Sequence, residues 1–167
     1  ARRFDAMVTA GGPIQVAVLD VDQFKAINDG HGHDVGDLVL VNISRALRAR
    51  FREQDAVFRL GGEEFLVLVE GADEDALIER LRAVREIVGS PVDVHRLTVP
   101  GIGFSAGIAT LPADGSDFEA LYRAADARLL QAKSQGRDRA ISAHRVVLLH
   151  DEAPPAETLP KSAGGKG

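Results

Sequence analysis

The sequence contains no cysteine, which excludes disulfide bonds and thiolate metal sites and is typical of a reducing compartment such as the cytoplasm. It has no apolar run long enough to span a membrane, and its first residues carry no secretory signal pattern. It also lacks an excess of basic residues, because the formal net charge is −5. A general nucleic-acid surface needs a basic face, so we expect neither nucleic acid nor a membrane as a partner.

The length and composition are those of one globular domain. The 167 residues (17.8 kDa) are enough to bury a single core, and 45% hydrophobic with 27% charged residues is an ordinary composition. We expect a folded domain over residues 1–149 and a disordered tail over residues 150–167. The tail is rich in Pro, Ala and Gly and has no apolar periodicity.

Apolar periodicity predicts strands and helices in a mixed order. Strands are predicted where short β-branched runs occur, at residues 14–20, 56–60, 65–69, 102–110 and 140–149. Amphipathic helices are predicted at residues 37–51, 73–88 and 121–135. Gly61-Gly62 is suited to a hairpin turn between the second and third strands. A hairpin combined with helical crossovers favours an α/β fold with a central, mainly antiparallel sheet flanked by helices.

Carboxylates follow or precede two of these strands. Asp20-Val21-Asp22 ends the first strand, and Glu63-Glu64 follows the glycine turn. If the two strands are neighbours, the carboxylates meet and offer the hard oxygen ligands that Mg²⁺ prefers, while the glycines let a polyphosphate approach the backbone. Two alternatives stay open from the residues alone: a solvated surface turn at Glu63-Glu64 and helix capping at Asp20 or Asp22.

Two longer motifs carry a resemblance to a known family. The segment from Asp20 to Asp37 reads DVDQFKAINDGHGHDVGD, and Gly61 to Phe65 reads GGEEF. These resemble the signatures of GGDEF domains, the diguanylate cyclases, which join two GTP molecules into cyclic di-GMP. The resemblance runs from Arg2 to about Ser142 and implies a fold similar to the nucleotidyl cyclase and polymerase palm.

The resemblance implies a Mg²⁺ (or Mn²⁺) site. Asp20 and Glu63 match the metal-binding carboxylates, the carbonyl of Val21 matches a backbone ligand, and Glu64 would complete a second metal site. Glu63 also matches the general base for the 3′-hydroxyl. Lys25 matches the catalytic residue that stabilises charge on the reacting phosphates, although alone it would be taken for a solvated surface lysine.

The resemblance places the guanine base at Asn28 and Asp37, which match the family's guanine readers. One carboxylate can accept from the adjacent N1–H and N2–H donors of guanine, and an amide can both donate and accept. A helix-ending turn at Asn28-Asp29-Gly30 is the structural alternative, and it is compatible with binding. Phe24 is also expected at the substrate.

The phosphates are expected at the glycine turn and near the end of the third predicted helix. The resemblance places Gly61 and Gly62 at the substrate, and Lys133 and Arg137 match its triphosphate-binding pair. Cations in this position also interact favourably with the helix dipole, which is the structural alternative.

His31 and His33 form an H-x-H pair, which suggests zinc. No cysteine and no third histidine stands close in the sequence. The resemblance instead places this segment near the nucleotide without zinc, with His33 among the substrate-binding residues.

A regulatory site is implied upstream of the glycine turn. Arg52-Glu53-Gln54-Asp55 fits the RxxD pattern of a product-inhibition site, and a planar guanidinium pairs well with phosphate or with the Hoogsteen edge of guanine. The alternative is an ordinary helix end followed by a loop. Arg80 is a looser candidate for a second cation.

The expected function is therefore that of a Mg²⁺-dependent diguanylate cyclase that works as a homodimer. The chain begins Ala1-Arg2-Arg3-Phe4, within the family's first DxLTxLxNRR motif, so the resemblance implies an upstream sensor domain. The first alternative is a catalytically weak domain that acts as a receptor for GTP or cyclic di-GMP. The second is another palm-type enzyme, such as an adenylyl cyclase, which Asn28 and Asp37 together with GGEEF disfavour.

Overall fold

The structure, a computed structural model, describes residues 2–150, so the expected tail lies outside the described residues except for its first residue. The helices are α1 (Arg2–Ala10), α2 (Phe24–His31), α3 (His33–Arg50), α4 (Glu74–Val88) and α5 (Phe118–Ser134). The strands are β1 (Ile14–Val21), β2 (Ala56–Gly61), β3 (Glu64–Glu70), β4 (Val92–Val94), β5 (Leu97–Val99), β6 (Phe104–Leu111), β7 (Arg139–Ile141) and β8 (Val146–Leu148). No helix in this part of the chain is both long and apolar enough to cross a membrane.

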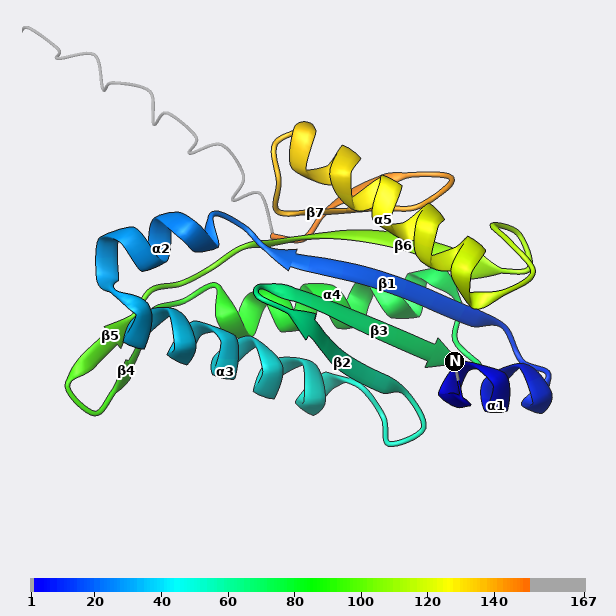
Figure 1. Ribbon diagram of the computed structural model, residues 1–167, viewed down its shortest axis with the longest axis horizontal. Coiled ribbons are helices and arrows are strands. Elements are labelled where there is room, and N and C mark those ends of the chain that lie inside the picture. Colours follow the sequence, from blue (N-terminus) through cyan, green and yellow to red (C-terminus); the bar gives the residue numbers. More distant parts are fainter. Residues whose placement is uncertain (1, 151–167) are drawn as a thin grey trace, which may run out of the picture.

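Six strands form the main sheet in the order β2-β3-β1-β6-β7-β8 (Figure 1). Every neighbouring pair is antiparallel except β6 and β7, which are parallel. This confirms the predicted α/β fold with a mainly antiparallel sheet. β1 lies between β3 and β6 and is buried along its whole length, which explains its nearly unbroken apolar sequence.

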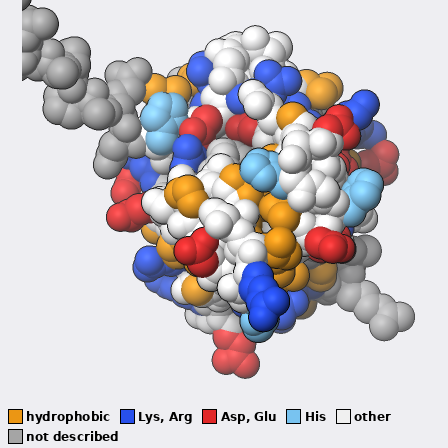
Figure 2. Space-filling model, turned by 90° about the vertical axis from the view of Figure 1, so that its left-hand side faces the viewer, with side chains coloured by type: hydrophobic (Ala, Val, Ile, Leu, Met, Phe, Trp, Pro, Cys, Tyr) orange, Lys and Arg blue, Asp and Glu red, His pale blue; other side chains and the backbone are white. Residues whose placement is uncertain are grey.

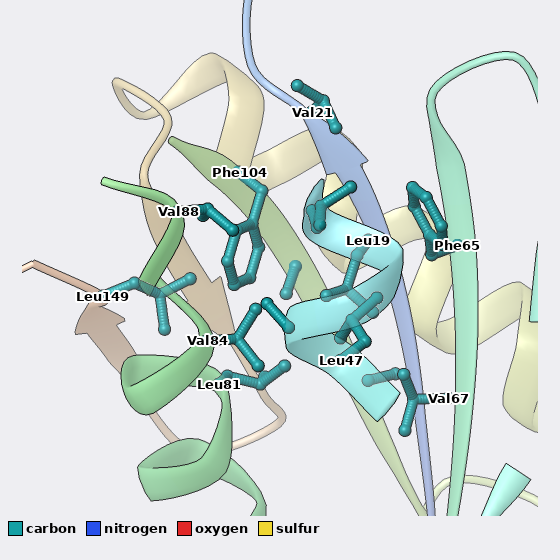
Figure 3. Close-up of a cluster of buried hydrophobic side chains, with 14 of the residues drawn as sticks. Leu19, Val21, Leu47, Phe65, Val67, Leu81, Val84, Val88, Phe104 and Leu149 are labelled. Atoms are coloured by element: carbon teal, nitrogen blue, oxygen red, sulfur yellow. The ribbon is translucent and has the colours of Figure 1, made fainter. Parts of the chain in front are cut away.

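The sheet has a hydrophobic core on each face, because alternate side chains of a strand point to opposite faces. Ala17, Leu19 and Val21 of β1 pack with α3 and α4, in the cluster that Figure 3 shows. The intervening Val16 and Val18 pack with α5 and α1. The two cores hold β1 rigidly, so the residues at its end have a fixed position.

The polar residues that the sequence analysis singled out lie mainly at one end of the sheet. β1 ends there, the β2–β3 hairpin turns there, and α2 follows β1 directly (left side of Figure 1). The C-terminal end of α5 lies at the same end, because Lys133 pairs with Asp20. Figure 2 looks onto this end, where acidic and basic side chains are interspersed.

Four elements were not predicted: α1, α2 and the β4–β5 hairpin, which forms a separate two-stranded sheet. α2 could not be recognised from the sequence, because it contains Asn28, Asp29 and Gly30, which have low helix propensity. Burial of Phe24 stabilises this helix instead. These three residues belong to the last turns of α2 rather than to a turn beyond it.

The predicted strand at residues 140–149 is wrong, because the segment forms two strands, β7 and β8. The Ser142 N–H donates to the Arg145 carbonyl (3.0 Å) and closes the turn between them. α5 begins three residues earlier than predicted, at Phe118, because Asp117 caps it by accepting from the Ala120 N–H (2.8 Å).

Candidate active site

The carboxylates of two neighbouring strands meet at the end of β1. Asp20 lies opposite Glu64 of β3 in the strand register, and the Val21 N–H donates to the Glu63 carbonyl (3.2 Å). The structure therefore brings Asp20, Val21, Glu63 and Glu64 together, as their places in the sequence predicted. The hairpin supplies this arrangement because β3 begins directly after the glycine turn.

Asp20 is a buried carboxylate with one close cation. Its Oδ2 lies 2.9 Å from Nζ of Lys133, which comes from the last turn of α5. Burial raises the pKa of Asp20, the Lys133 ammonium opposes this, and the negative charges of Glu63 and Glu64 raise the pKa further. The site therefore brings the negative charges of Asp20, Glu63 and Glu64 together, and the ammonium of Lys133 is the cation that pairs with Asp20.

These residues fit a divalent cation only as a partial set of ligands. Among residues 2–150, no three His, Cys, Asp or Glu side chains form a group that could hold a metal ion. Asp20 and Glu63 with the Val21 carbonyl would leave positions for phosphate oxygens and water, which is the usual coordination of protein-bound Mg²⁺. His31 and His33 are exposed and belong to no ligand group.

The glycine turn is held by an arginine that the sequence analysis left without a role. Nε of Arg59 donates to the Gly62 carbonyl (2.9 Å), which fixes the turn from the β2 side. Gly62 has φ of 53°, a backbone conformation that glycine adopts without strain. Gly61 and Gly62 both face open space where a side chain would stand, so a ligand can approach the backbone there.

The two candidate base readers come from adjacent helices. Asn28 is half-buried in α2, and a Cβ at Gly36 of α3 would overlap its Oδ1. Gly36 thus makes room for the Asn28 side chain at the helix turn that also carries Asp37. Asp37 is exposed and lines a cavity with Leu40 and arginines of α3 and β2.

The remaining predicted residues of α2 and α3 lie around this place. Phe24 is buried and belongs to the core that faces α3 and α4, so it supports α2. Lys25 follows it and is exposed. His33 is the exposed first residue of α3, and Asp37 follows one turn later.

The loop after α5 carries Arg137 and lies near Asp22, which follows β1. Arg137 is exposed and lines a cavity of about 340 Å³ together with Asp22, Gln23, Gly103 and Asp138, among others. Asp22 was grouped with Asp20 in the sequence but points elsewhere, because it accepts hydrogen bonds from Ser105 and from the backbone of Asp138. No sequence pattern identified Ser105 or Asp138, since both act through tertiary contacts.

The RxxD segment lies away from the carboxylates, at the start of β2. Oδ2 of Asp55 accepts from the Arg52 N–H (2.8 Å) and from Nη1 of Arg80 (2.8 Å). Oδ1 of Asp55 is buried and has no hydrogen-bond partner, alone among the buried side-chain polar atoms of residues 2–150. Asp55 and Arg52 line a cavity of about 430 Å³ with Arg48 and Phe51.

Comparison with known proteins identifies the family. The family model described as "Diguanylate cyclase, GGDEF domain" matches residues 2–139, so the chain belongs to the GGDEF domain family. It is 40% identical over 148 residues to MucR, a bifunctional diguanylate cyclase/cyclic di-GMP phosphodiesterase of Pseudomonas aeruginosa, covering 81% of this chain and 21% of MucR. It is 44% identical over 133 residues to the diguanylate cyclase DgcP of the same organism, covering 77% of this chain and 19% of DgcP.

Solved structures agree with this assignment. The GGDEF domain of YfiN (TpbB) from Pseudomonas aeruginosa superposes with a TM-score of 0.78 at 31% identity, covering 86% of this chain and 90% of that one. The GGDEF domain of DgcB from Caulobacter crescentus, solved in complex with c-di-GMP, has a TM-score of 0.77 at 28% identity, with coverages of 86% and 85%. The chain spans about a fifth of the length of the two curated relatives above.

Proposed function

We propose that this chain forms one half of a diguanylate cyclase active site and converts GTP into cyclic di-GMP together with a second copy of itself. The observation that carries the proposal is the meeting of Asp20 with Glu63, Glu64 and Lys133 at the end of β1. Acidic and basic groups of this kind, beside a cavity that Arg137 lines, are suited to a metal-bound triphosphate.

Asp20, Glu63 and the Val21 carbonyl are the proposed ligands of Mg²⁺ or Mn²⁺, with Glu64 available to a second ion. A bound divalent ion would neutralise phosphate charge and lower the pKa of a coordinated hydroxyl. Glu63 is half-buried at the hairpin and would accept the proton of the 3′-hydroxyl as a general base.

The chain's own cations and amides would orient the nucleotide. Lys133 and Arg137 are the proposed triphosphate ligands, and the exposed backbone of Gly61 and Gly62 leaves room beside them. Lys25 would stabilise charge on the reacting phosphates as a mobile point charge.

The base would be read by Asn28 and Asp37. Asp37 would accept from N1–H and N2–H of guanine, and Asn28 would pair with the neighbouring edge. Phe24 holds α2 against the core beneath this pair, and His33 would contact the nucleotide from the start of α3.

The proposed reaction needs two half-sites. The 3′-oxygen of each GTP attacks the α-phosphorus of the other, each α–β P–O bond breaks, two pyrophosphates leave, and the two hydroxyl protons pass to Glu63 or to water. Positioning and charge neutralisation account for most of the catalysis in such transfers. One chain holds one nucleotide, so ring closure requires a homodimer.

We also propose that Arg52 and Asp55 form a site for the product, with Arg80 as its second cation. Arg52 is exposed and lines a cavity with Arg48 and Asp55, which supports this, because a planar guanidinium pairs well with phosphate. If synthesis is absent, the same site supports a second candidate function, that of a cyclic di-GMP receptor.

The direct test is to incubate the purified chain with GTP and Mg²⁺ and to identify the nucleotides by mass spectrometry. We expect cyclic di-GMP and pyrophosphate in a ratio of one to two. Unchanged GTP together with tight cyclic di-GMP binding would favour the receptor, and unchanged GTP with no nucleotide binding would overturn both proposals.

A further inference from the structure

The loop that carries Arg137 is strained. Gly136, Arg137 and Asp138 have φ of 117°, 64° and 49°, so three consecutive residues lie on the positive side. Side chains other than glycine pay a steric cost there, and such residues persist only when their surroundings fix them. The strain falls on a residue that lines the cavity beside β1.

The backbone of this loop is fixed at each residue that follows the glycine. The Arg137 N–H donates to the Ala132 carbonyl of α5 (3.0 Å), and the Asp138 N–H donates to Oδ2 of Asp22 (2.9 Å). The Asp138 carbonyl accepts from the Leu149 N–H (3.1 Å). The hydrogen bond to Asp22 is the one that ties the loop to the end of β1.

Asp22 is held in place by hydrogen bonds to Ser105 of β6 and to Gly103, which lies just before β6. Its Oδ1 accepts from Oγ of Ser105 (2.7 Å), which is fully buried, and its N–H donates to the Gly103 carbonyl (3.0 Å). A Cβ at Gly103 would lie 3.1 Å from Cγ of Asp138 and 3.2 Å from Oδ2 of Asp22, so only glycine leaves this junction undisturbed. Both oxygens of Asp22 are therefore committed to hydrogen bonds within the protein.

Arg85 of α4 holds the loop from its other side. Its Nε and Nη2 donate to Oδ1 (2.6 Å) and Oδ2 (2.8 Å) of Asp138, the bidentate geometry that fixes a carboxylate most firmly. His150 lies 3.0 Å from the same Oδ2. Arg85 is not among the residues that line the cavity of Arg137, and its hydrogen bonds to this loop are those to Asp138.

We propose that Asp22 and Arg85 are positioning residues that hold Gly136–Asp138 so that Arg137 faces the triphosphate. The second carboxylate of Asp20-Val21-Asp22 would then serve the phosphate-binding loop, while the first serves the metal. This inference rests on the proposed function, since it assumes that the phosphates bind beside Arg137.

The test compares two ligands in calorimetry: guanosine, and a GTP analogue with a methylene group between the α- and β-phosphates, which cannot release pyrophosphate. Arg85→Ala and Asp22→Asn should weaken binding of the analogue about tenfold, because Arg137 loses its fixed position, and should leave guanosine affinity unchanged. A merely structural role would weaken both ligands alike. Arg123→Ala, in an exposed pair with Glu119 in the first turns of α5, is the matched control and should change neither affinity.

A double-mutant cycle completes the test. In an Arg137→Ala background, Arg85→Ala and Asp22→Asn should cause no further loss, because they act through Arg137. Should Arg85→Ala unfold the chain, Arg85→Lys keeps the charge but loses the second hydrogen bond, and it should give the same selective loss.

Two results would overturn the inference. The first is that folded Arg85→Ala and Asp22→Asn variants keep the parent's ratio of analogue affinity to guanosine affinity. The second is that their losses of analogue affinity add fully to the loss caused by Arg137→Ala. A parent chain that binds the analogue no better than guanosine would instead count against the proposed function, and this inference would fall with it.

Discussion

At the scale of single residues, the site depends on a small number of charges that have more than one use. Lys133 neutralises the buried Asp20, and the same ammonium is a proposed ligand of the triphosphate. Glu63 and Glu64 increase the negative charge around Asp20. Removing one carboxylate should therefore affect catalysis far more than folding.

Glu63→Gln should reduce cyclic di-GMP synthesis at least about 100-fold, because it removes a metal ligand and the proposed general base with a nearly isosteric change. The melting temperature should stay close to that of the parent. Glu70→Gln, at the opposite end of β3, is the matched control and should keep parental turnover. Turnover measured beside a thermal melt decides the matter, and parental activity in Glu63→Gln would rule out both roles.

The chain should prefer GTP to ATP, because adenine presents an acceptor at N1 to the Asp37 carboxylate. Asp37 is exposed, so water limits the penalty, and we expect a preference of about 10- to 100-fold, or about 1.4 to 2.7 kcal/mol. Asp37→Asn should reduce this preference, whereas Asp34→Asn in the same helical turn should not. Calorimetry with both nucleotides and Mg²⁺ measures it, and equal affinities in the parent would refute the assignment of Asp37.

Arg52→Ala should weaken cyclic di-GMP binding by about 1.5 to 3 kcal/mol, the scale of hydrogen bonds to charged groups, and leave GTP affinity unchanged. Arg52 is the better probe of the RxxD site, because Asp55 also pairs with Arg80 and its loss would disturb the fold. Arg50→Ala, in the last turn of α3, serves as control. Calorimetric titration with product, if it gave equal affinities for parent and Arg52→Ala, would place product binding elsewhere.

At the scale of secondary structure elements, the strands that carry the site could be predicted from the sequence. The residues that contact the site from other elements could be predicted only in part. The positions of Asp20 and Glu63 at the ends of neighbouring strands were predicted correctly, because the apolar runs that form these strands can be recognised in the sequence. Ser105, Asp138 and Arg85 were not recognised, because each acts on a residue that is distant in the chain. The position of Asn28 depends on the absence of a side chain at Gly36, which no periodicity reveals.

The loop between β6 and α5 offers a test of stability that is independent of the site. The guanidinium of Arg128 donates to both oxygens of Asp114, at 2.5 and 2.8 Å, and lowers the pKa of that carboxyl from 3.8. The folded state therefore binds this proton more weakly than the unfolded state. The contribution is fully present above about pH 4 and is lost as the pH falls through the lowered folded-state pKa.

Asp114→Asn should lower the free energy of unfolding at pH 7 by about 3 kcal/mol, because it leaves the largely buried Arg128 without its counter-ion. The difference from the parent should shrink as the pH falls below 4. Urea unfolding at both pH values measures it, with Glu119→Gln, in an exposed pair with Arg123, as a control of little effect. A difference that grows towards acid pH would contradict the assigned pKa direction.

At the scale of the whole molecule, the chain supplies one proposed set of ligands for one nucleotide, and the proposed product contains two. The fold belongs to the GGDEF family, and it places Asp20, Glu64 and Lys133 together at one end of the sheet. A second copy must face that end for each 3′-hydroxyl to reach the other α-phosphate. Activity should therefore depend on how often two chains meet.

The most direct test of this account is the rate of cyclic di-GMP synthesis per chain, measured with saturating Mg²⁺ and GTP across a wide dilution series. We predict that cyclic di-GMP is formed and that the rate per chain rises with protein concentration until the dimer is saturated. The absence of cyclic di-GMP at the highest concentration, in a chain that demonstrably binds GTP with Mg²⁺, would contradict the claim that this domain is a diguanylate cyclase.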